Sequence, residues 1–501
     1  MKQFIVLFIT LAALIAALLI GCTDSAPTAP AIGLGNSTIT KYVAIGNSLT
    51  AGYQSAGLYE SAQIYSYPNL IAQQLRKAGA NIGSFEQPIF SDPGTPDPIT
   101  GKASRYEIIS LVGPVIGPKG LTAGSPTNST LSRPYDNLGI PGIPLAGFMD
   151  STGTYQSPPL GRDVILRWTT NALLGKSVFK QVATLNAMGQ TPDLVTFWLG
   201  ANDVLGFAVS GGTSPNAPTD VATFSSLYGK ALDALRTTLP NAKIVVGNIP
   251  DVTSIPFFTT VNPLAAPQIP APYYLRYQKH GTLGMSFDST KLTEANAPLI
   301  TLKGQAYAAL LGQATGQFWR DAAALKGTTI AALYPTLAGA GIDTTKPFGF
   351  HPQNPWPDAL ILDADEIATA TSAVNNFNSV IATAAAALTH NALVVDFNSF
   401  FNNVKAHGLN IAGERYTADY ISGDIFSLDG VHPSDRGYGI VANEYIKVIN
   451  AYYGMNIPLV DVSTLPKLSA PLSKGKNGKI DPLLPFGAFN SLDLLFRPSV
   501  Q

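Results

Sequence analysis

Two short segments hold side chains that could perform nucleophilic chemistry. Ser48 lies in the segment GNSLT at 46–50, directly after the apolar run YVAI at 42–45. Near the other end of the chain, Asp429 and His432 stand three residues apart in DGVHP at 429–433. A serine hydroxyl is a weak nucleophile until a base removes its proton, and a histidine oriented by a carboxylate is such a base. Together, a serine, a histidine and an aspartate are the residue types that catalyse acyl transfer in many hydrolases.

A third segment, GAND at 200–203, follows the apolar run at 194–199. The amide of Asn202 could donate a hydrogen bond to the oxyanion that acyl transfer creates. We expect Asp203, beside it, to be structural and to bind backbone near the strand end. Each segment alone is a weak signal. The three segments together are far more specific evidence for this chemistry, because they occur in this order and each lies at a strand exit or in a terminal loop.

In this order, the three segments resemble blocks of the SGNH/GDSL hydrolase superfamily of esterases and lipases. The resemblance implies a nucleophile at Ser48, a base at His432, and Asp429 as the residue that holds the base. One departure is Asn47, because the namesake motif of the family has an aspartate before the serine. Taken alone, His432 would be interpreted as a loop histidine before a helix capped by Ser434, but the spacing from Asp429 and the segment around Ser48 favour the base.

The same resemblance implies an oxyanion hole with three donors. They are the Asn202 amide, the Ser48 N–H and a glycine N–H from a loop between these two blocks. The segment NLGIPG at 137–142 looks like that block. Gly142 is the first choice and Gly139 the second, while a plain turn glycine next to Pro141 is the alternative for Gly142.

The N-terminus has the layout of a secretory signal. One lysine precedes an apolar stretch at 4–20, and LIGC at 19–22 resembles a bacterial lipobox. Cleavage before Cys22 and lipidation of its thiol are therefore expected, with the protein anchored in the cell envelope at the outer membrane. The alternative is an uncleaved anchor, since these 17 residues, all apolar except Thr10, lie at the short limit for a membrane span. Cys22 is the only cysteine, which favours the lipoprotein.

Composition agrees with an exported globular enzyme. Hydrophobic residues make up 46% of the chain, enough for a sizeable core. Charged residues make up only 13% and the net charge is −1, so a nucleic-acid partner is not expected. No metal or other cofactor is expected either, because the remaining histidines have no partner at metal-ligand spacing. These histidines are His280, His351, His390 and His407.

Elements that could position these residues alternate along the chain. Continuous apolar runs predict strands at 41–46, 192–200, 243–248 and 392–397, and 81–90 is compatible with another. Periodic apolar patterns predict helices at 67–80, 175–189, 219–239, 363–390 and 434–452, with a further helix possible around 302–325. This alternation favours a parallel α/β sheet covered on both faces, with sites at the carboxyl ends of its strands. The family resemblance implies a three-layer α/β/α, flavodoxin-like arrangement.

The predicted domain organisation follows from these patterns. It consists of a signal peptide at 1–21, a lipid-anchored tether at 22–40, a hydrolase domain at 41–453 and a C-terminal tail at 454–501. Two insertions, at about 91–135 and 256–357, interrupt the hydrolase domain. The second contains aromatic residues that could line a cleft over the site or pack a small core of their own. They are Phe257, Phe258, Tyr273, Tyr274, Tyr277 and Trp319.

The sequence therefore predicts a lipid-anchored serine hydrolase that cleaves carboxylic esters. Its expected partners are an ester substrate, either an acyl lipid or an O-acetylated glycan, and the membrane that holds its lipid anchor. Low charge and apolar loop residues lean slightly towards an apolar acyl group. The competing hypothesis is a non-catalytic surface lipoprotein that uses the same fold to bind a ligand. A complete set of Ser48, His432, Asp429 and Asn202 argues against that hypothesis.

Overall fold

The computed structural model describes residues 31–98, 100–110, 115–150, 177–213, 217–261, 275–278, 287–288 and 298–468. The predicted signal peptide, Cys22 and the end of the tail lie outside these residues, as do Tyr273 and Tyr274. Within the described ranges, no helix is both long and apolar enough to cross a bilayer.

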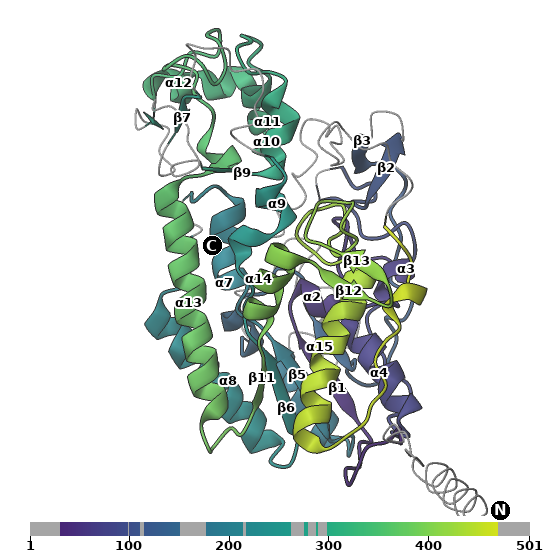
Figure 1. Cartoon of the computed structure of the whole chain (residues 1–501). Coiled ribbons are helices and arrows are strands. Elements are labelled where there is room, and N and C mark those ends of the chain that lie inside the picture. The colour runs from purple at the N-terminus through teal and green to yellow at the C-terminus, as the bar shows by residue number, and fades with distance from the viewer. Residues whose placement is uncertain are drawn as a thin grey trace, which may run out of the picture.

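A five-stranded parallel sheet forms the centre of the protein, in the order β11-β6-β5-β1-β4 (Figure 1). Its strands are β1 (Tyr42–Gly46), β4 (Asn137–Gly139), β5 (Leu194–Trp198), β6 (Lys243–Gly247) and β11 (Leu393–Val395). In the register of the sheet, Gly46 at the end of β1 pairs with Gly139 and Trp198. The carboxyl ends of β4, β1 and β5 are therefore level, and the segments that follow them meet at one edge.

Helices cover both faces of the sheet, which gives the predicted three-layer α/β/α architecture (Figure 1). On one face α4 (Tyr67–Lys77) packs against α15 (Asp435–Tyr453), and on the other α8 (Val221–Thr238) packs against α13 (Ala364–Ala386). The remaining helices of this unit are α2 (Ser48–Ala51), α3 (Glu60–Gln63), α6 (Val178–Ala187), α7 (Asn202–Val209) and α14 (Phe397–His407). Burial of both sheet faces explains why its strands are apolar without alternation.

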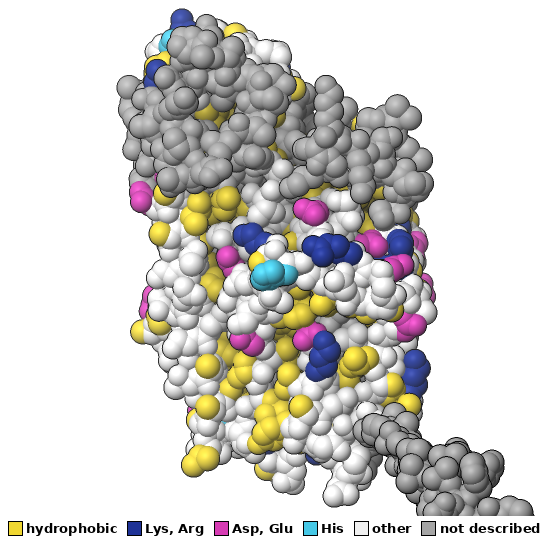
Figure 2. Space-filling model, in the orientation of Figure 1, with side chains coloured by type: hydrophobic (Ala, Val, Ile, Leu, Met, Phe, Trp, Pro, Cys, Tyr) yellow, Lys and Arg dark blue, Asp and Glu magenta, His cyan; other side chains and the backbone are white. Residues whose placement is uncertain are grey.

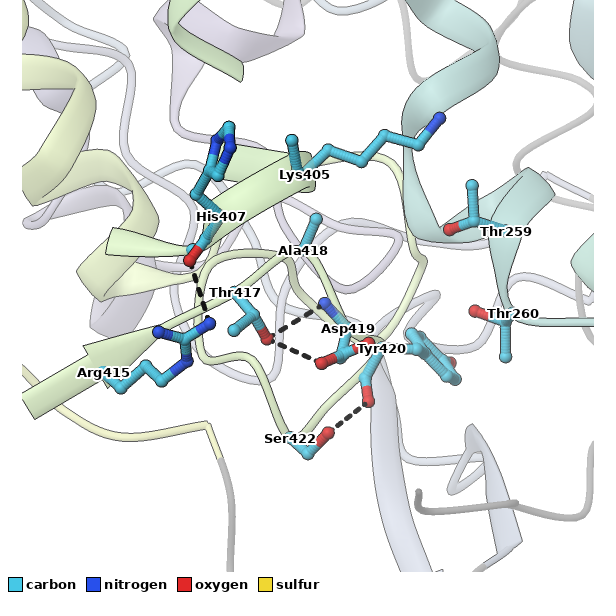
Figure 3. Close-up of a pocket in the computed structure, with 12 residues that line it drawn as sticks. Thr259, Thr260, Lys405, His407, Arg415, Thr417, Ala418, Asp419, Tyr420 and Ser422 are labelled. Carbon is cyan, nitrogen blue, oxygen red and sulfur yellow. Dashed lines mark hydrogen bonds between the residues drawn. The ribbon is translucent and has the colours of Figure 1, made fainter. Parts of the chain in front are cut away.

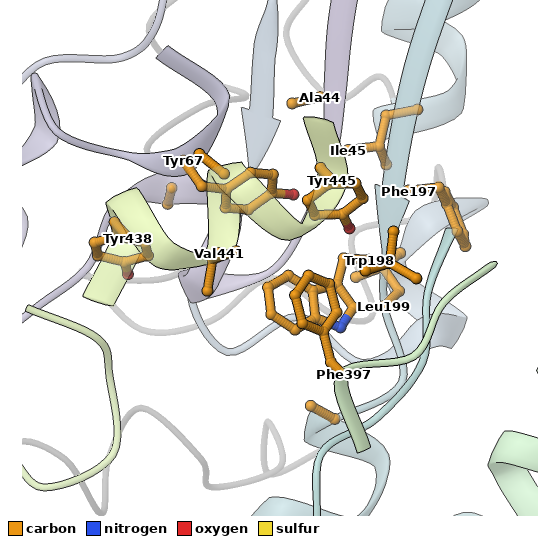
Figure 4. Close-up of a cluster of buried hydrophobic side chains, with 14 of the residues drawn as sticks. Ala44, Ile45, Tyr67, Phe197, Trp198, Leu199, Phe397, Tyr438, Val441 and Tyr445 are labelled. Atoms are coloured by element: carbon orange, nitrogen blue, oxygen red, sulfur yellow. The ribbon is translucent and has the colours of Figure 1, made fainter. Parts of the chain in front are cut away.

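Aromatic side chains fill the core between the sheet and the α4–α15 layer (Figure 4). Trp198 of β5 stacks on Phe397 at the start of α14, with ring centroids 4.2 Å apart. Tyr67 of α4 stacks on Tyr445 of α15 at 5.1 Å. Aromatic pairs of this kind add stability beyond the area that they bury. The core therefore fixes the strand that precedes Asn202 against the helix that follows His432.

The second insertion folds into a cap with its own hydrophobic cluster. Its elements are α9 (Pro256–Thr259), β7 (Tyr277–Gln278), β8 (Phe287–Asp288), β9 (Leu299–Ile300), α10 (Leu302–Ala308), α11 (Gln317–Leu325) and α12 (Ile330–Gly339). Tyr277 and Trp319 belong to the separate cluster, whereas Phe257 and Phe258 are buried in the main core. These four aromatic residues therefore pack cores and do not line a cleft. The possible helix at 302–325 is two helices, separated by Gly312 and Gly316, which both have positive φ.

The first insertion contains the hairpin β2 (Tyr106–Ser110) and β3 (Val115–Pro118). The strand considered at 81–90 is wrong, because that segment is an irregular stretch beside the sheet edge. There the Glu86 carbonyl accepts the N–H groups of Asp136 and Asn137. The fifth strand is β4, within the segment that resembles a glycine loop.

Other elements agree with the sequence, including the N-terminus of α13. Asp363 and Glu366 form a capping box there. The C-terminal part contains β10 (Ile361–Leu362) and the hairpin β12 (Leu409–Ile411) and β13 (Glu414–Tyr416). Residues 454–468, the described part of the predicted tail, pack against α15, and the Asn443 Nδ2 donates to the Val460 carbonyl at 3.0 Å. A bridge between Gly33 and Asn456 joins the end of the predicted tether to this segment.

Candidate active site

A tight turn holds Ser48 at the exit of β1. Asn47 is the N-cap residue of α2, and its Oδ1 accepts the Leu49 N–H at 3.0 Å. Gly46 permits this turn, because a Cβ there would lie 2.0 Å from the Thr50 Oγ1. As the first helical residue, Ser48 has a backbone N–H that the helix itself does not use. The Asn47 side chain therefore still caps the turn that carries the serine.

Asp429 shapes the loop that carries His432. Its Oδ1 accepts the backbone N–H groups of Val431 at 2.9 Å and His432 at 2.8 Å. The Ser427 N–H closes the loop by donating to the His432 carbonyl at 2.7 Å. Gly430 has φ of 69°, a left-handed conformation that glycine adopts without strain. One carboxylate can therefore both form the turn and face the imidazole that lies three residues later.

The structure brings the three predicted residues together in one chain of hydrogen bonds. The Asp429 Oδ2 lies 2.9 Å from the His432 Nδ1, and the His432 Nε2 lies 2.9 Å from the Ser48 Oγ. Ser48, Asp429 and His432 are all at least 98% buried. A carboxylate, an imidazole and a hydroxyl in this order form a Ser-His-Asp triad by geometry.

Further donors surround the Asp429 carboxylate. The Ala56 N–H donates to its Oδ2 at 3.0 Å, and the Ser427 Oγ donates to its Oδ1 at 3.1 Å. Burial alone would raise the pKa of Asp429, but the charge of His432 and the hydrogen bonds from the ring and backbone of His432 and from the Ala56 N–H hold that pKa below its usual value. The Asp429 carboxyl group is therefore ionised and can stabilise a positive charge on the neighbouring imidazole.

Two residues with a strained backbone conformation, Ser55 and Ala56, donate hydrogen bonds to Ser427 and Asp429. Ser55 and Ala56 have φ of 49° and 63°, values that non-glycine residues rarely adopt. In this conformation the Ser55 N–H donates to the Ser427 Oγ at 2.9 Å, and the Ala56 N–H reaches Asp429. Strained residues of this kind often lie at functional sites. Sequence analysis missed Ser55, Ala56 and Ser427, since nothing in their local sequence distinguishes them from ordinary loop residues.

Tyr53 packs against the His432 imidazole. Its ring centroid lies 4.7 Å from that of His432, and its carbonyl accepts the Tyr438 hydroxyl at 2.6 Å. The aromatic face restricts the rotation of the histidine ring. This contact, too, was missed, because Tyr53 lies far from His432 in the sequence.

Asn202 begins α7 directly beyond the end of β5. Its Nδ2 donates to the Ile143 carbonyl at 2.9 Å. A primary amide has two N–H groups, so this bond fixes the side chain and leaves a second N–H to donate elsewhere. Asn202 also lines the same pocket as Ser48 and His432.

The two candidate glycines differ in what their N–H groups do. The Gly139 N–H donates to the Asn137 Oδ1 at 3.0 Å, so it is already used inside β4. Gly142 has φ of 77°, and within the described residues we find no acceptor for its N–H. Gly142 also adjoins Ile143, which contacts Asn202. Of the two glycines, Gly142 is therefore the one whose N–H has no acceptor among the described residues.

Asp203 is structural, as predicted. Its Oδ2 accepts the Leu145 N–H at 2.8 Å, and its Oδ1 accepts the Thr219 hydroxyl at 2.9 Å. Burial raises the pKa of Asp203 to about 6. The bond to Leu145 connects α7 to the loop after β4 and thereby positions Asn202 against Ile143, and the bond to Thr219 connects α7 to the segment before α8.

A pocket with an apolar lining opens beside the triad. Ser48, Asn202 and His432 lie on its wall together with apolar side chains from several parts of the chain, and its cavity volume is about 60 Å³. The apolar lining includes Trp198, Leu205, Val252, Ile255, Phe401 and Phe426. Sequence analysis did not identify these residues, which meet only in the folded chain.

The other described histidines have no catalytic partner. The Nε2 of His390 lies 2.8 Å from Asp233 Oδ1 and its Nδ1 lies 2.7 Å from the Ala384 carbonyl, while the Nδ1 of His407 lies 2.9 Å from Asn403 Oδ1. Among the described residues, no group of three or more His, Cys, Asp or Glu side chains could hold a metal ion. His280 lies outside the described residues.

Comparison with known proteins agrees with this geometry. The GDSL-like lipase/acylhydrolase family model matches residues 42–445, and the chain therefore belongs to this family of ester hydrolases. No curated protein matches the chain. Among solved structures, the chain is similar to the Clostridium thermocellum family 3 carbohydrate esterase, with a TM-score of 0.30 and 12% identity over 84% of this chain and 100% of that chain.

Proposed function

We propose that this protein is a serine esterase that hydrolyses carboxylic esters through Ser48, His432 and Asp429. The observation that supports the proposal is the unbroken hydrogen-bond chain from Asp429 Oδ2 through the imidazole to Ser48 Oγ, with both heavy-atom distances at 2.9 Å. A ligand-binding protein has no need of a buried hydroxyl bonded to an oriented imidazole.

The reaction follows from the positions of these atoms. The His432 Nε2 accepts the proton of Ser48 as its Oγ attacks the ester carbonyl, and Asp429 stabilises the resulting imidazolium. The tetrahedral intermediate collapses to an acyl-serine, and the alcohol leaves with the proton from His432. A water molecule, deprotonated by the same histidine, then attacks the acyl-serine and releases the acid and Ser48.

The charge that develops on the carbonyl oxygen needs donors already in place. In this proposal they are the Ser48 N–H, the second Asn202 Nδ2–H and the Gly142 N–H. The bond from Asn202 to the Ile143 carbonyl supports this role, because it holds the amide without using both of its protons. Asp203 acts indirectly, by fixing the loop that contains Ile143.

The pocket beside the triad suits the acyl part of an ester, because its lining is mostly apolar. The proposed substrate is therefore a carboxylic ester with an apolar acyl group, carried by an acyl lipid or by an O-acetylated glycan.

The proposed cellular setting rests on the N-terminal sequence alone. The lipobox-like segment at 19–22 supports a lipoprotein anchored through Cys22 in the cell envelope, at the outer membrane. The triad does not depend on the anchor, so the esterase proposal can be tested on soluble protein that begins after residue 22.

A fluorophosphonate probe tests the nucleophile directly. We expect it to label Ser48 and to abolish hydrolysis of p-nitrophenyl acetate, because the probe reacts only with an activated serine. Ser48→Ala should lose both labelling and turnover, while Ser226→Ala, an exposed serine on α8, should keep both. Full turnover by Ser48→Ala would refute the proposal.

A further inference from the structure

A second hollow lies beside the apolar pocket and differs from it in chemistry. Its volume is about 260 Å³, and it lies between α9, the end of α14 and the chain around β13 (Figure 3). Lys405 and His407 line it from α14, Arg415 from β13, and Thr259 from α9. Figure 3 shows Lys405 extending from the end of α14 towards Thr259.

Positive charge dominates this hollow. Lys405 and Arg415 are both exposed, and within the described ranges neither has an ion pair with a carboxylate. Asp419 is the one carboxylate in the lining. The neighbouring Glu414 is bound by Arg436 and Lys467 and is not available to compensate these charges. Figure 2 shows basic side chains and a histidine together in the middle of this face. The lining therefore carries two cations and one carboxylate, a formal excess of one positive charge.

The two hollows share a wall. Ala418 lines both of them. Phe401 lines the apolar pocket and Lys405 the basic one, and both lie on α14. Residues four apart on a helix lie on the same side, about 6 Å apart along the axis. A group bound in the basic hollow would therefore be within reach of the rest of an ester held at Ser48.

From this geometry, and resting on the proposed esterase function, we infer that the basic hollow binds a negatively charged group on the alcohol part of the substrate. With the acyl group in the small apolar pocket, the alcohol part extends outwards, and the adjoining hollow offers two cations and several hydroxyl groups. Arg and Lys favour carboxylate and phosphate groups, with charge-assisted hydrogen bonds. The substrate is thus an ester of an anionic alcohol, such as an acetylated sugar acid or an acylated glycerol phosphate.

Matched pairs of esters test this inference. One pair is an acetylated methyl glucuronoside and the corresponding acetylated methyl glucoside. The other is a short-chain acyl glycerol phosphate and the acylglycerol without phosphate. An exposed ion pair is worth a factor of about 2 to 5, so two should raise kcat/KM for the charged member about tenfold. Because exposed charges are screened, this preference should shrink as salt is added. A preference in only one pair identifies the source of the anion.

Charge variants connect the preference to this hollow. Lys405→Gln with Arg415→Gln should abolish it and leave turnover of the neutral esters unchanged. Since Arg415 also donates to the His407 carbonyl, Lys405→Glu alone provides a variant that spares this bond and should favour the neutral ester. Lys180→Gln with Lys230→Gln removes the same charge from exposed positions on α6 and α8 and should keep the preference.

Failure of this inference is distinguishable from failure of the esterase proposal. Probe labelling of Ser48 and turnover of p-nitrophenyl acetate establish the esterase independently of any charged substrate. If both are present but the parent protein turns over charged and neutral esters equally, the basic hollow is not a substrate site. Retention of the preference in the Lys405/Arg415 double variant would overturn the inference as well.

Discussion

Asp429 illustrates how much depends on a single side chain in this site. Its carboxylate accepts hydrogen bonds from five groups, of which four belong to its own loop at 427–432 and one comes from elsewhere. The four local donors are the Ser427 hydroxyl, the N–H groups of Val431 and His432 and the imidazole Nδ1–H, and the fifth donor is the Ala56 N–H. This arrangement makes Asp429 both the orienting residue of the triad and the main stabiliser of the loop around it.

The different roles in the triad lead to the first prediction. His432→Ala should reduce kcat about as much as Ser48→Ala, because base and nucleophile act as a unit. Asp429→Ala should retain more activity, since the aspartate orients the base and does not transfer the proton. Steady-state kinetics with p-nitrophenyl acetate, alongside the Tm of each variant, provide the measurement. Equal, near-parental rates in both variants would show that the loop at 427–432 is not catalytic.

The second prediction concerns the oxyanion. Asn202→Ala should lower kcat by roughly 10²–10³ with little change in KM, the usual cost of one oxyanion donor. Asp203→Asn should have a smaller effect, because it retains one acceptor for the Leu145 N–H. A rise in KM alone for Asn202→Ala would instead identify it as a substrate-binding residue.

The third prediction concerns Asp435, in the first turn of α15. Burial raises its pKa to about 7, well above the value of 3.8 for an unperturbed carboxyl. Folding therefore favours the protonated form, so this group makes the protein less stable as pH rises from about 4 to 7. Asp435→Asn should remove this loss, which is at most about 1.4 kcal/mol per pH unit. Thermal unfolding at pH 5 and pH 8 should show the gain at pH 8; an unchanged pH dependence would contradict the prediction.

At the residue scale, the sequence predicted what short motifs can encode. Ser48, Asp429 and His432 could be predicted because each lies in a recognisable segment, and Asn202 because it follows an apolar strand. Ala56, Ser427 and Tyr53 could not, because their roles arise from contacts with residues more than 370 positions away or from a backbone conformation that no local pattern signals.

Elements show the same division between local and distant determinants. Local patterns predicted the strands β1, β5 and β6 from their apolar runs. They also predicted the helices α8 and α13. β4 was not predicted, since a three-residue strand ending in glycine looks like a loop. The segment at 81–90 was predicted as a possible strand. In the structure β4 is the edge strand of the sheet, and 81–90 lies beside it without forming a strand. Of the cap helices, α10 and α11 were predicted as one possible helix at 302–325, and α12, which contains Pro335, was missed.

One contact between elements gives the fourth prediction. The Phe257 N–H of α9 donates to the Gly430 carbonyl at 2.9 Å, so the start of the cap supports the triad loop. A Cβ on Gly430 would lie 3.0 Å from Leu302 and 3.1 Å from the Phe257 nitrogen, and its φ is 69°. Gly430→Ala should therefore cost about 1–2 kcal/mol for the left-handed backbone and also displace His432, which lowers kcat.

Gly413→Ala provides the matched control. Gly413 also has positive φ, 82°, but a Cβ there meets no atom within 4 Å. It should lose similar stability by thermal unfolding and keep the parental kcat. If Gly430→Ala kept full activity as well, the contact between α9 and the loop would have no role in positioning the base.

At the scale of the whole molecule, the fifth prediction concerns attachment to the membrane. Cys22→Ser should release the protein from the membrane fraction or leave an unprocessed precursor, since the only thiol is then absent. Fractionation followed by immunoblotting measures this, with Ser226→Ala as the control. Unchanged membrane association after removal of residues 1–22 would mean that another part of the chain holds the protein there.

The place where the chain enters the sheet determines which way the enzyme would face. β1 begins at Tyr42, just after the segment whose Gly33 pairs with Asn456, and Ser48 stands at the other end of this strand. Five residues of strand span about 17 Å, and a fully extended segment at 22–30 spans at most about 30 Å. A lipid on Cys22 would therefore keep the amino ends of the strands within a bounded distance of its own membrane. Ser48 would stand a strand length further from the anchor, and polymers in the aqueous space beside that membrane would come within its reach.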